Sequence, residues 1–231
     1  MNRFRQIVCI FAFSICAANF SKAEELIAID VLIQPDQKML SVSEQWNAKL
    51  REQTPEGFEL DEEHAPHITL IQSYVAESDM PRVLEAVKEV KSRWDLDELK
   101  MTATGLYHIP TGDIGLAGIV VEPSTTLIEL QNEIIAAVSP YSKSGGGEAA
   151  FVPDKSDTPF DPLLFKYVET FVPNQTGDKF NPHVTIGVAP LGWLEELEKE
   201  PFNKFTFGAR GIAVYQLGNF GTASKRLDTG K

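Results

Sequence analysis

The hydrophobic and polar positions of the chain predict alternating strands and helices. Short β-branched apolar runs, or positions that alternate with a period of two, predict strands, whereas apolar residues at three- and four-residue spacing predict helices. In the first part of the chain these patterns predict, in order, a strand over 26–33, a helix over 39–50 behind the candidate cap Asp36, a strand over 66–71, a helix from Ser78 and a strand over 99–107.

The same order of elements is predicted a second time. The run Ile114 to Pro123 resembles Leu26 to Pro35, including its final proline. The elements predicted after it are a helix capped by Ser124, a strand that begins at Pro182, a short helix over 193–199 and two strands over 205–207 and 212–217. The plan therefore occurs twice, and we predict a single domain of two related halves, about 24–110 and 111–231.

One segment of the second half has no counterpart in the first. It falls near residues 141–175, where the run Gly145-Gly146-Gly147 and several prolines are typical of loops. We predict a long loop that lies over the site and includes a strand at 165–171. A disordered insertion is the alternative.

Two short motifs stand at equivalent places in the two halves. The sequences Pro66-His67-Ile68-Thr69 and Pro182-His183-Val184-Thr185 each begin a predicted strand. Because side chains two apart on a strand face the same side, each strand presents an imidazole together with a hydroxyl, while the apolar neighbours face the core. If the halves pack about a pseudo-twofold axis, the two imidazoles meet across one cleft.

Two imidazoles on opposite sides of a bound phosphorus have the geometry that in-line displacement requires. One neutral ring takes a proton from the attacking water, and the other, protonated, delivers a proton to the departing ribose oxygen. The hydroxyls of Thr69 and Thr185 can donate to the non-bridging oxygens, so the reaction requires no metal and no other cofactor. Pseudo-symmetry leaves open which of His67 and His183 is the acid.

Three further residues are predicted to contact substrate. The chain has 4 histidines, and His64 precedes the first motif at the expected mouth of the cleft. Lys179 and Phe180 directly precede the second motif. A metal site made of the histidines, His108 included, is disfavoured, because none has a partner at helical i, i+4 spacing and threonine is a poor zinc ligand.

With both motifs identified, residues 26–220 resemble the two-histidine phosphoesterase superfamily, which includes bacterial 2'-5' RNA ligase-like proteins and cyclic phosphodiesterases. The resemblance rests on His67, Thr69, His183 and Thr185. It implies an α+β, bilobal fold of two antiparallel-rich sheets flanked by helices around a central groove. It also implies phosphodiesterase activity on 2',3'-cyclic phosphate or 2'-5' phosphodiester bonds, with 2'-5' RNA ligase activity as a further expectation. A non-catalytic periplasmic module that binds nucleotides or RNA ends is the alternative.

The net charge of the chain limits the kinds of ligand that we expect it to bind. It has 33 acidic and 21 basic residues and a formal net charge of −12, so we expect no binding to long nucleic acid. A small nucleotide or an RNA end, bound by a monomer, needs only a local positive patch. Candidates for that patch are Lys166, Lys179, Lys204, Arg210, Lys225 and Arg226.

The first residues are typical of a signal peptide. Two arginines precede an apolar run, and the small residues Ser21 and Ala23 stand before a possible cleavage site. Because Cys9 and Cys16 lie in residues 1–23, their removal leaves no cysteine for a disulfide. We therefore expect a periplasmic or secreted protein, residues 24–231, with no membrane association after cleavage.

Overall fold

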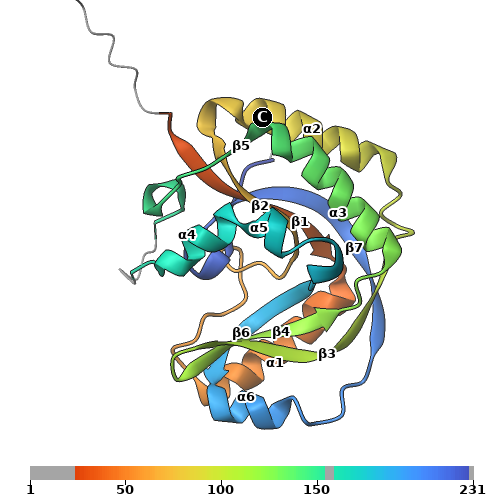
Figure 1. Ribbon diagram of the computed structural model, residues 1–231. Helices are drawn as coiled ribbons and strands as arrows, with labels where there is room; N and C mark the ends of the chain where they lie inside the picture. Colours follow the sequence, from red (N-terminus) through yellow and green to blue (C-terminus); the bar gives the residue numbers. More distant parts are fainter. Residues whose placement is uncertain (1–23, 154–158, 229–231) are drawn as a thin grey trace, which may run out of the picture.

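A computed structural model describes residues 24–153 and 159–228 (Figure 1). The predicted signal peptide, residues 1–23, lies outside the described residues. Across the part of the chain that is described, no helix has both the length and the apolar character that a membrane span requires.

An antiparallel sheet of 8 strands forms the centre of the molecule. The predicted α+β class with antiparallel strands is confirmed, and the two predicted sheets are joined into one. The strands are β1 (Leu26–Pro35), β2 (Ile68–Ala76), β3 (Lys100–Thr111), β4 (Ile114–Val121), β5 (Ser142–Lys143), β6 (His183–Pro190), β7 (Phe205–Leu217) and β8 (Ala223–Arg226). Their order is β5-β2-β1-β7-β3-β4-β6, with β8 paired to β7. The beginning of β7 pairs with β3 and the rest pairs with β1, so this curved strand joins two wings of the sheet (Figure 1). One wing contains β5, β2, β1 and β8, and the other contains β3, β4 and β6.

Helices lie along the outer sides of both wings, and two short helices of the second half lie between the wings (Figure 1). The helices are α1 (Gln37–Gln53), α2 (Met80–Arg93), α3 (Thr125–Val138), α4 (Pro162–Glu169), α5 (Phe171–Asn174) and α6 (Leu191–Leu197). Short 3-10 turns are η1 (Glu77–Asp79), η2 (Ser139–Tyr141), η3 (Glu148–Ala150), η4 (Gly177–Lys179) and η5 (Asn219–Gly221). The predicted caps are confirmed, because Asp36 accepts from the Met39 N–H and Ser124 accepts from the Leu127 N–H.

The two sequence halves exchange elements instead of forming separate sheets. Strand β1 pairs with β2 and with β7 of the second half, while β4 pairs with β6 and with β3 of the first half. Helix α1 packs on β6, and α3 packs on β2. The boundary expected near residue 110 lies in the β3–β4 hairpin, where Gly112 has a φ of 64°. Each wing therefore contains elements of both halves.

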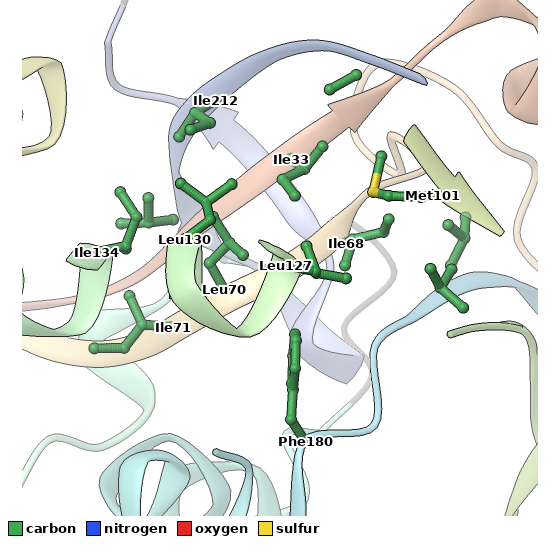
Figure 2. Packing of buried hydrophobic residues seen from close by; sticks show 14 of the residues in the cluster. Ile33, Ile68, Leu70, Ile71, Met101, Leu127, Leu130, Ile134, Phe180 and Ile212 are labelled. Carbon is green, nitrogen blue, oxygen red and sulfur yellow. The ribbon is translucent and has the colours of Figure 1, made fainter. Parts of the chain in front are cut away.

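The apolar face of α3 packs over β2 and β1. Leu127, Leu130 and Ile134 form this face, and Phe180 points toward the same cluster from the segment before β6 (Figure 2). The apolar neighbours of the motif residues are fully buried, namely Ile68, Leu70, Val184 and Ile186. Because side chains alternate along a strand, this inward packing turns the histidine and threonine of each motif toward the cleft.

The predicted strand at 165–171 is wrong, since these residues belong to α4 and α5. Helix α4 begins behind Asp161, whose carboxylate accepts from the Leu163 N–H at 2.8 Å, with Pro162 in the first turn. The apolar residues are nearly contiguous here, so a strand period and a helix period fit them equally well, and the capping residues decide.

Part of the 141–175 segment packs on the sheet. Phe151 and Val168 are buried in a small second core together with Tyr74 of β2.

The predicted strands over 205–207 and 212–217 are one continuous strand, β7, because Gly208 and Gly211 stay in the ladder opposite Lys100 and Gln34. Strand β8 was not predicted.

Candidate active site

Each motif histidine is fixed at one ring nitrogen. His67 stands immediately before β2, and His183 is the first residue of β6. In both rings Nδ1 lies 2.7 Å from the carbonyl oxygen two residues earlier, which is that of Ala65 for His67 and Asn181 for His183. A carbonyl oxygen can only accept, so each Nδ1 carries the hydrogen. Both Nε2 atoms are left to exchange protons with a ligand.

Strand pairing shows that the motifs occupy equivalent positions. The register of the β1–β2 pair shifts at Leu32, which faces Thr69. The β4–β6 pair has the same irregularity at Gly118, which faces Thr185. The same β-bulge therefore occurs in both halves, next to the motif threonine in each case.

Asp30 of β1, which the sequence analysis did not identify, lies beneath the first motif. Its side chain is fully buried, and its Oδ2 accepts from Thr69 Oγ1 at 2.7 Å and from Gln72 Nε2 at 3.2 Å. The same Oδ2 lies 3.5 Å from Nε2 of His67. Asp30 therefore contacts both the threonine and the histidine of the first motif.

The equivalent position beneath the second motif is apolar. The two registers equate Asp30 with Leu116 and Gln72 with Val188. The hydroxyl of Thr185 has no hydrogen-bond partner among the described residues, and Thr185 lines a hollow together with Leu116. The hydroxyl of Thr185 can therefore donate to a ligand, whereas that of Thr69 already donates to Asp30.

This difference gives the two rings opposite pKa shifts. Burial opposes the charge on His67, but the nearby carboxylate of Asp30 outweighs it and raises the pKa of His67. At 3.5 Å the contact is long for a hydrogen bond, so we attribute the effect mainly to charge. Burial lowers the pKa of His183, and the charge of His67 lowers it further, although the Asn181 carbonyl and the charge of Asp30 partly offset this. The arrangement favours a protonated His67 beside a neutral His183.

The four motif residues line two small hollows. His67 and Thr185 line a hollow of about 30 Å³, and Thr69 and His183 line a second hollow of about 10 Å³. Each hollow thus combines the histidine of one motif with the threonine of the other. The electrostatic effect of His67 on His183 agrees with this proximity. The structure therefore brings together the four residues predicted to carry the chemistry.

Tyr107 of β3 supports the ring of His183. The two ring centroids are 4.9 Å apart at an interplanar angle of 63°, which is an edge-to-face contact. Gly118 makes room for this contact, because a Cβ atom at that position would overlap the ring of Tyr107. Burial raises the pKa of the Tyr107 hydroxyl, which therefore stays protonated. In the sequence, Tyr107 is only an aromatic residue near the end of a predicted strand.

The 141–175 segment also reaches the cleft. Tyr167 of α4 lines the hollow that contains Thr69 and His183. Burial raises the pKa of Tyr167 to about 12, and the charge of Asp30 contributes to the shift. The long insertion therefore forms part of the wall, in helical form.

The remaining predicted residues have different positions. His64 lines the hollow of His67, and Phe180 lines that of His183 while also belonging to the core. Lys179 lines neither hollow, and its ammonium group donates to the Pro173 carbonyl at 2.8 Å. His108 bonds Glu198 instead, with Nδ1 at 2.7 Å from Oε1.

Charged groups are few in the lining of the cleft. The described residues that line the two hollows include no lysine or arginine, so the expected positive patch does not lie there. Within residues 24–153 and 159–228, no three His, Cys, Asp or Glu side chains group together in a way that could hold a metal ion.

Two interleaved halves, each with a His-x-Thr strand at a shared cleft, define the two-histidine phosphoesterase class. The family model described as 2'-5' RNA ligase superfamily matches residues 41–215, and the chain belongs to this superfamily. No curated protein matches the chain significantly.

Solved structures with a similar arrangement are distant in sequence. TT0787 of Thermus thermophilus is 15% identical with a TM-score of 0.49, over 87% of this chain and 95% of that one. Usb1 of Kluyveromyces marxianus is 11% identical with a TM-score of 0.41, over 88% of this chain and 98% of that one. The same Usb1 with uridine monophosphate is 10% identical with a TM-score of 0.38, over 86% and 98%.

Proposed function

We propose that this protein is a phosphodiesterase that hydrolyses 2',3'-cyclic phosphate or 2'-5' phosphodiester bonds of nucleotides or RNA ends, with His67 as the acid and His183 as the base. The observation that carries the proposal is the pair of rings itself. Both are tethered at Nδ1, and each lines a hollow together with the threonine of the other motif, yet their pKa values are shifted in opposite directions.

The reaction consists of one displacement at phosphorus. Nε2 of His183 removes a proton from water as the water oxygen forms a bond to phosphorus. The bond from phosphorus to the departing ribose oxygen breaks, and that oxygen takes the proton from Nε2 of His67. Thr185 donates to a non-bridging oxygen. Afterwards His183 is protonated and His67 neutral, and exchange with solvent restores the starting state.

The charge of the cleft supports a substrate with one phosphodiester group. Among the described residues that line the two hollows, His67 is the histidine whose pKa the surroundings raise, which favours its cationic form. One such charge matches the single negative charge of a diester better than it matches a polyphosphate chain. The net charge of −12 acts in the same direction.

The test is incubation of the purified protein with adenosine 2',3'-cyclic phosphate and with 2'-5'-linked dinucleotides in EDTA, followed by product identification. We expect metal-independent hydrolysis by the wild type, and a loss of about 10²- to 10⁴-fold in His67→Ala and His183→Ala. Full turnover by either variant would contradict the proposal. Binding without turnover by the wild type would instead indicate a non-catalytic nucleotide-binding module.

The assignment of acid and base has a test of its own. p-Nitrophenolate leaves without a proton, so a p-nitrophenyl phosphodiester requires no general acid. We expect His67→Ala to recover most of its activity on this substrate, and His183→Ala to remain impaired. The reverse result would exchange the two roles while leaving the reaction intact.

A further inference from the structure

Phe220, in the connection between β7 and β8, has an unusual backbone conformation. Its φ is 56° and its ψ is 15°, and it is the one non-glycine residue of the described chain with a positive φ. For a bulky side chain this left-handed conformation is strained. The Phe220 side chain is also 51% exposed, so burial in the core does not compensate the strain.

Neighbouring residues hold Phe220 in this conformation. The side-chain oxygen of Asn219 accepts from the Phe220 N–H at 2.9 Å. The carbonyl oxygen of Asn219 accepts from the Thr222 hydroxyl at 2.9 Å, and the Gly218 N–H donates to the Thr222 carbonyl, also at 2.9 Å. The turn is therefore fixed by several bonds that together present an aromatic ring to solvent.

The ring of Phe220 borders the cleft. It lines the hollow that contains His67, and it also lines a neighbouring groove of about 550 Å³. Phe58 and His64 line both of these spaces as well, with their rings stacked at 5.1 Å and an interplanar angle of 14°. The groove has the volume of a small-molecule site, and it shares Phe58, His64, Phe220 and Thr222 with the hollow that contains His67.

The lining of this groove does not suit a phosphate. Its described residues include Glu56 and Glu63 and no lysine or arginine. Aromatic walls beside acidic side chains attract a flat, uncharged group and repel an anion. Thr222 and Ser224 also line the groove. The Thr222 hydroxyl donates to the Asn219 carbonyl and bonds the Ser224 hydroxyl, so these oxygens can only accept from the polar edges of such a group.

We propose that this groove is the nucleobase subsite, with the base stacked on Phe220 and the Phe58–His64 pair forming another part of its wall. This inference rests on the proposed function, because the base must enter the groove while its phosphodiester lies between His67 and His183. A ring presented at a groove that shares residues with the hollow of His67 is suited to this stacking, and stacking on an aromatic side chain accepts any base. The subsite therefore favours nucleotides over other cyclic phosphodiesters without requiring one particular base.

The experiment compares two substrates, adenosine 2',3'-cyclic phosphate and methyl riboside 2',3'-cyclic phosphate, which lacks a base. We expect wild-type kcat/KM to be at least about tenfold higher for the nucleotide. In Phe220→Gly the ratio between the two substrates should fall toward one. Glycine removes the ring and also relieves the positive-φ strain, so Tm should not fall, which separates base contact from folding.

Two variants serve as controls. Phe220→Tyr keeps an aromatic face and should keep the preference for the nucleotide. Ile109→Ala removes an exposed apolar side chain (45%) that lines none of these spaces, and should leave both activities unchanged. An unaltered ratio in Phe220→Gly, or an equal loss on both substrates, would overturn the subsite.

Calorimetric binding keeps this inference separate from the catalytic proposal. Adenosine 2'-monophosphate should bind the wild type more tightly than Phe220→Gly, by about tenfold. If the wild type cleaves neither substrate but shows this difference, the base subsite stands and the proposed hydrolysis fails. Equal affinities would reject the subsite whatever the activity.

Discussion

The carboxylate of Asp30 accepts the hydroxyl hydrogen of Thr69 at 2.7 Å. In the second half, Leu116 occupies the position of Asp30, and Thr185 has no hydrogen-bond partner among the described residues. Two halves with the same strands and the same β-bulge therefore place one histidine beside a buried carboxylate and the other beside apolar side chains. The two halves are therefore alike in fold but differ around the histidines, so that one ring is suited to donate a proton and the other is suited to accept one.

Replacement of Asp30 by Asn keeps the shape of the side chain and removes its charge. Without that charge, burial dominates and the pKa of His67 should fall below its ordinary value. The acid would then lose its proton at lower pH, so the alkaline limb of the kcat profile should move to lower pH. Once the pKa of His67 lies below the assay pH, we expect kcat to fall roughly tenfold for each further unit by which the pKa falls.

The readout is the pH profile together with NMR titration of the His67 ring. The acidic limb, which reports deprotonation of His183, should move less and also to lower pH, because the charge of Asp30 is the weakest of the causes that act on the pKa of His183. A uniform loss of kcat with no shift of the alkaline limb would show that Asp30 supports the fold and not the charge of His67.

The two motif threonines should respond differently to Val. Thr185→Val removes a free donor and should lower kcat by about 10²- to 10³-fold, with little change in the free energy of unfolding. Thr69→Val removes a partner of a buried carboxylate and should lower the free energy of unfolding by about 1–3 kcal/mol. Urea denaturation and single-turnover kinetics measure both effects. The opposite pattern would mean that Thr69 turns from Asp30 to the substrate.

The alternating order of strands and helices and the two His-x-Thr motifs could be predicted, because local sequence patterns encode them. Period-two alternation marks both His-x-Thr strands, and Asp36 and Ser124 cap their helices as expected. The register could not be predicted. Pro35 and Pro123 look equivalent in the sequence, yet the strand pairing equates Pro35 with Val121, because the β-bulges and not the prolines set the alignment.

Residues whose role depends on tertiary contacts are not marked by a local sequence pattern. Asp30 stands in a β-branched run as the one acidic residue, but only the pairing of β1 with β2 shows that it lies beneath His67 and Thr69. Tyr107 reaches His183 from a strand of the other half. Contacts between halves depend on how the elements are exchanged, which periodicity does not encode.

The opposite pKa shifts also predict opposite effects of pH on stability. His67 has a raised folded pKa, so its contribution is fully present below the unfolded value near 6.5 and is lost as pH rises through the folded pKa. His183 has a lowered folded pKa, so its contribution is present above about 6.5 and is lost as pH falls through the folded pKa. Urea denaturation at a series of pH values measures the slopes.

Comparison with Gln variants isolates each ring from the carboxylates that also titrate. The difference between wild type and His67→Gln should shrink as pH rises above 6.5, and that between wild type and His183→Gln should shrink as pH falls below it. Parallel stability curves for wild type and either variant would show that the ring has the same pKa in the folded and unfolded states.

A substitution at Gly118 tests whether Tyr107 holds the ring of His183 in place. A methyl group in Gly118→Ala would overlap the Tyr107 ring and push it from His183, so we expect a loss of about 1–3 kcal/mol in stability and about tenfold in kcat. The matched control is Gly105→Ala in β3, where the added methyl group has open space and should change stability by less than about 0.5 kcal/mol. The double variant Gly118→Ala, Tyr107→Ala removes the overlap, so its stability loss should be smaller than the sum of the single losses. Strict additivity would mean that the two residues do not act on each other, and that His183 is held by its Asn181 bond alone.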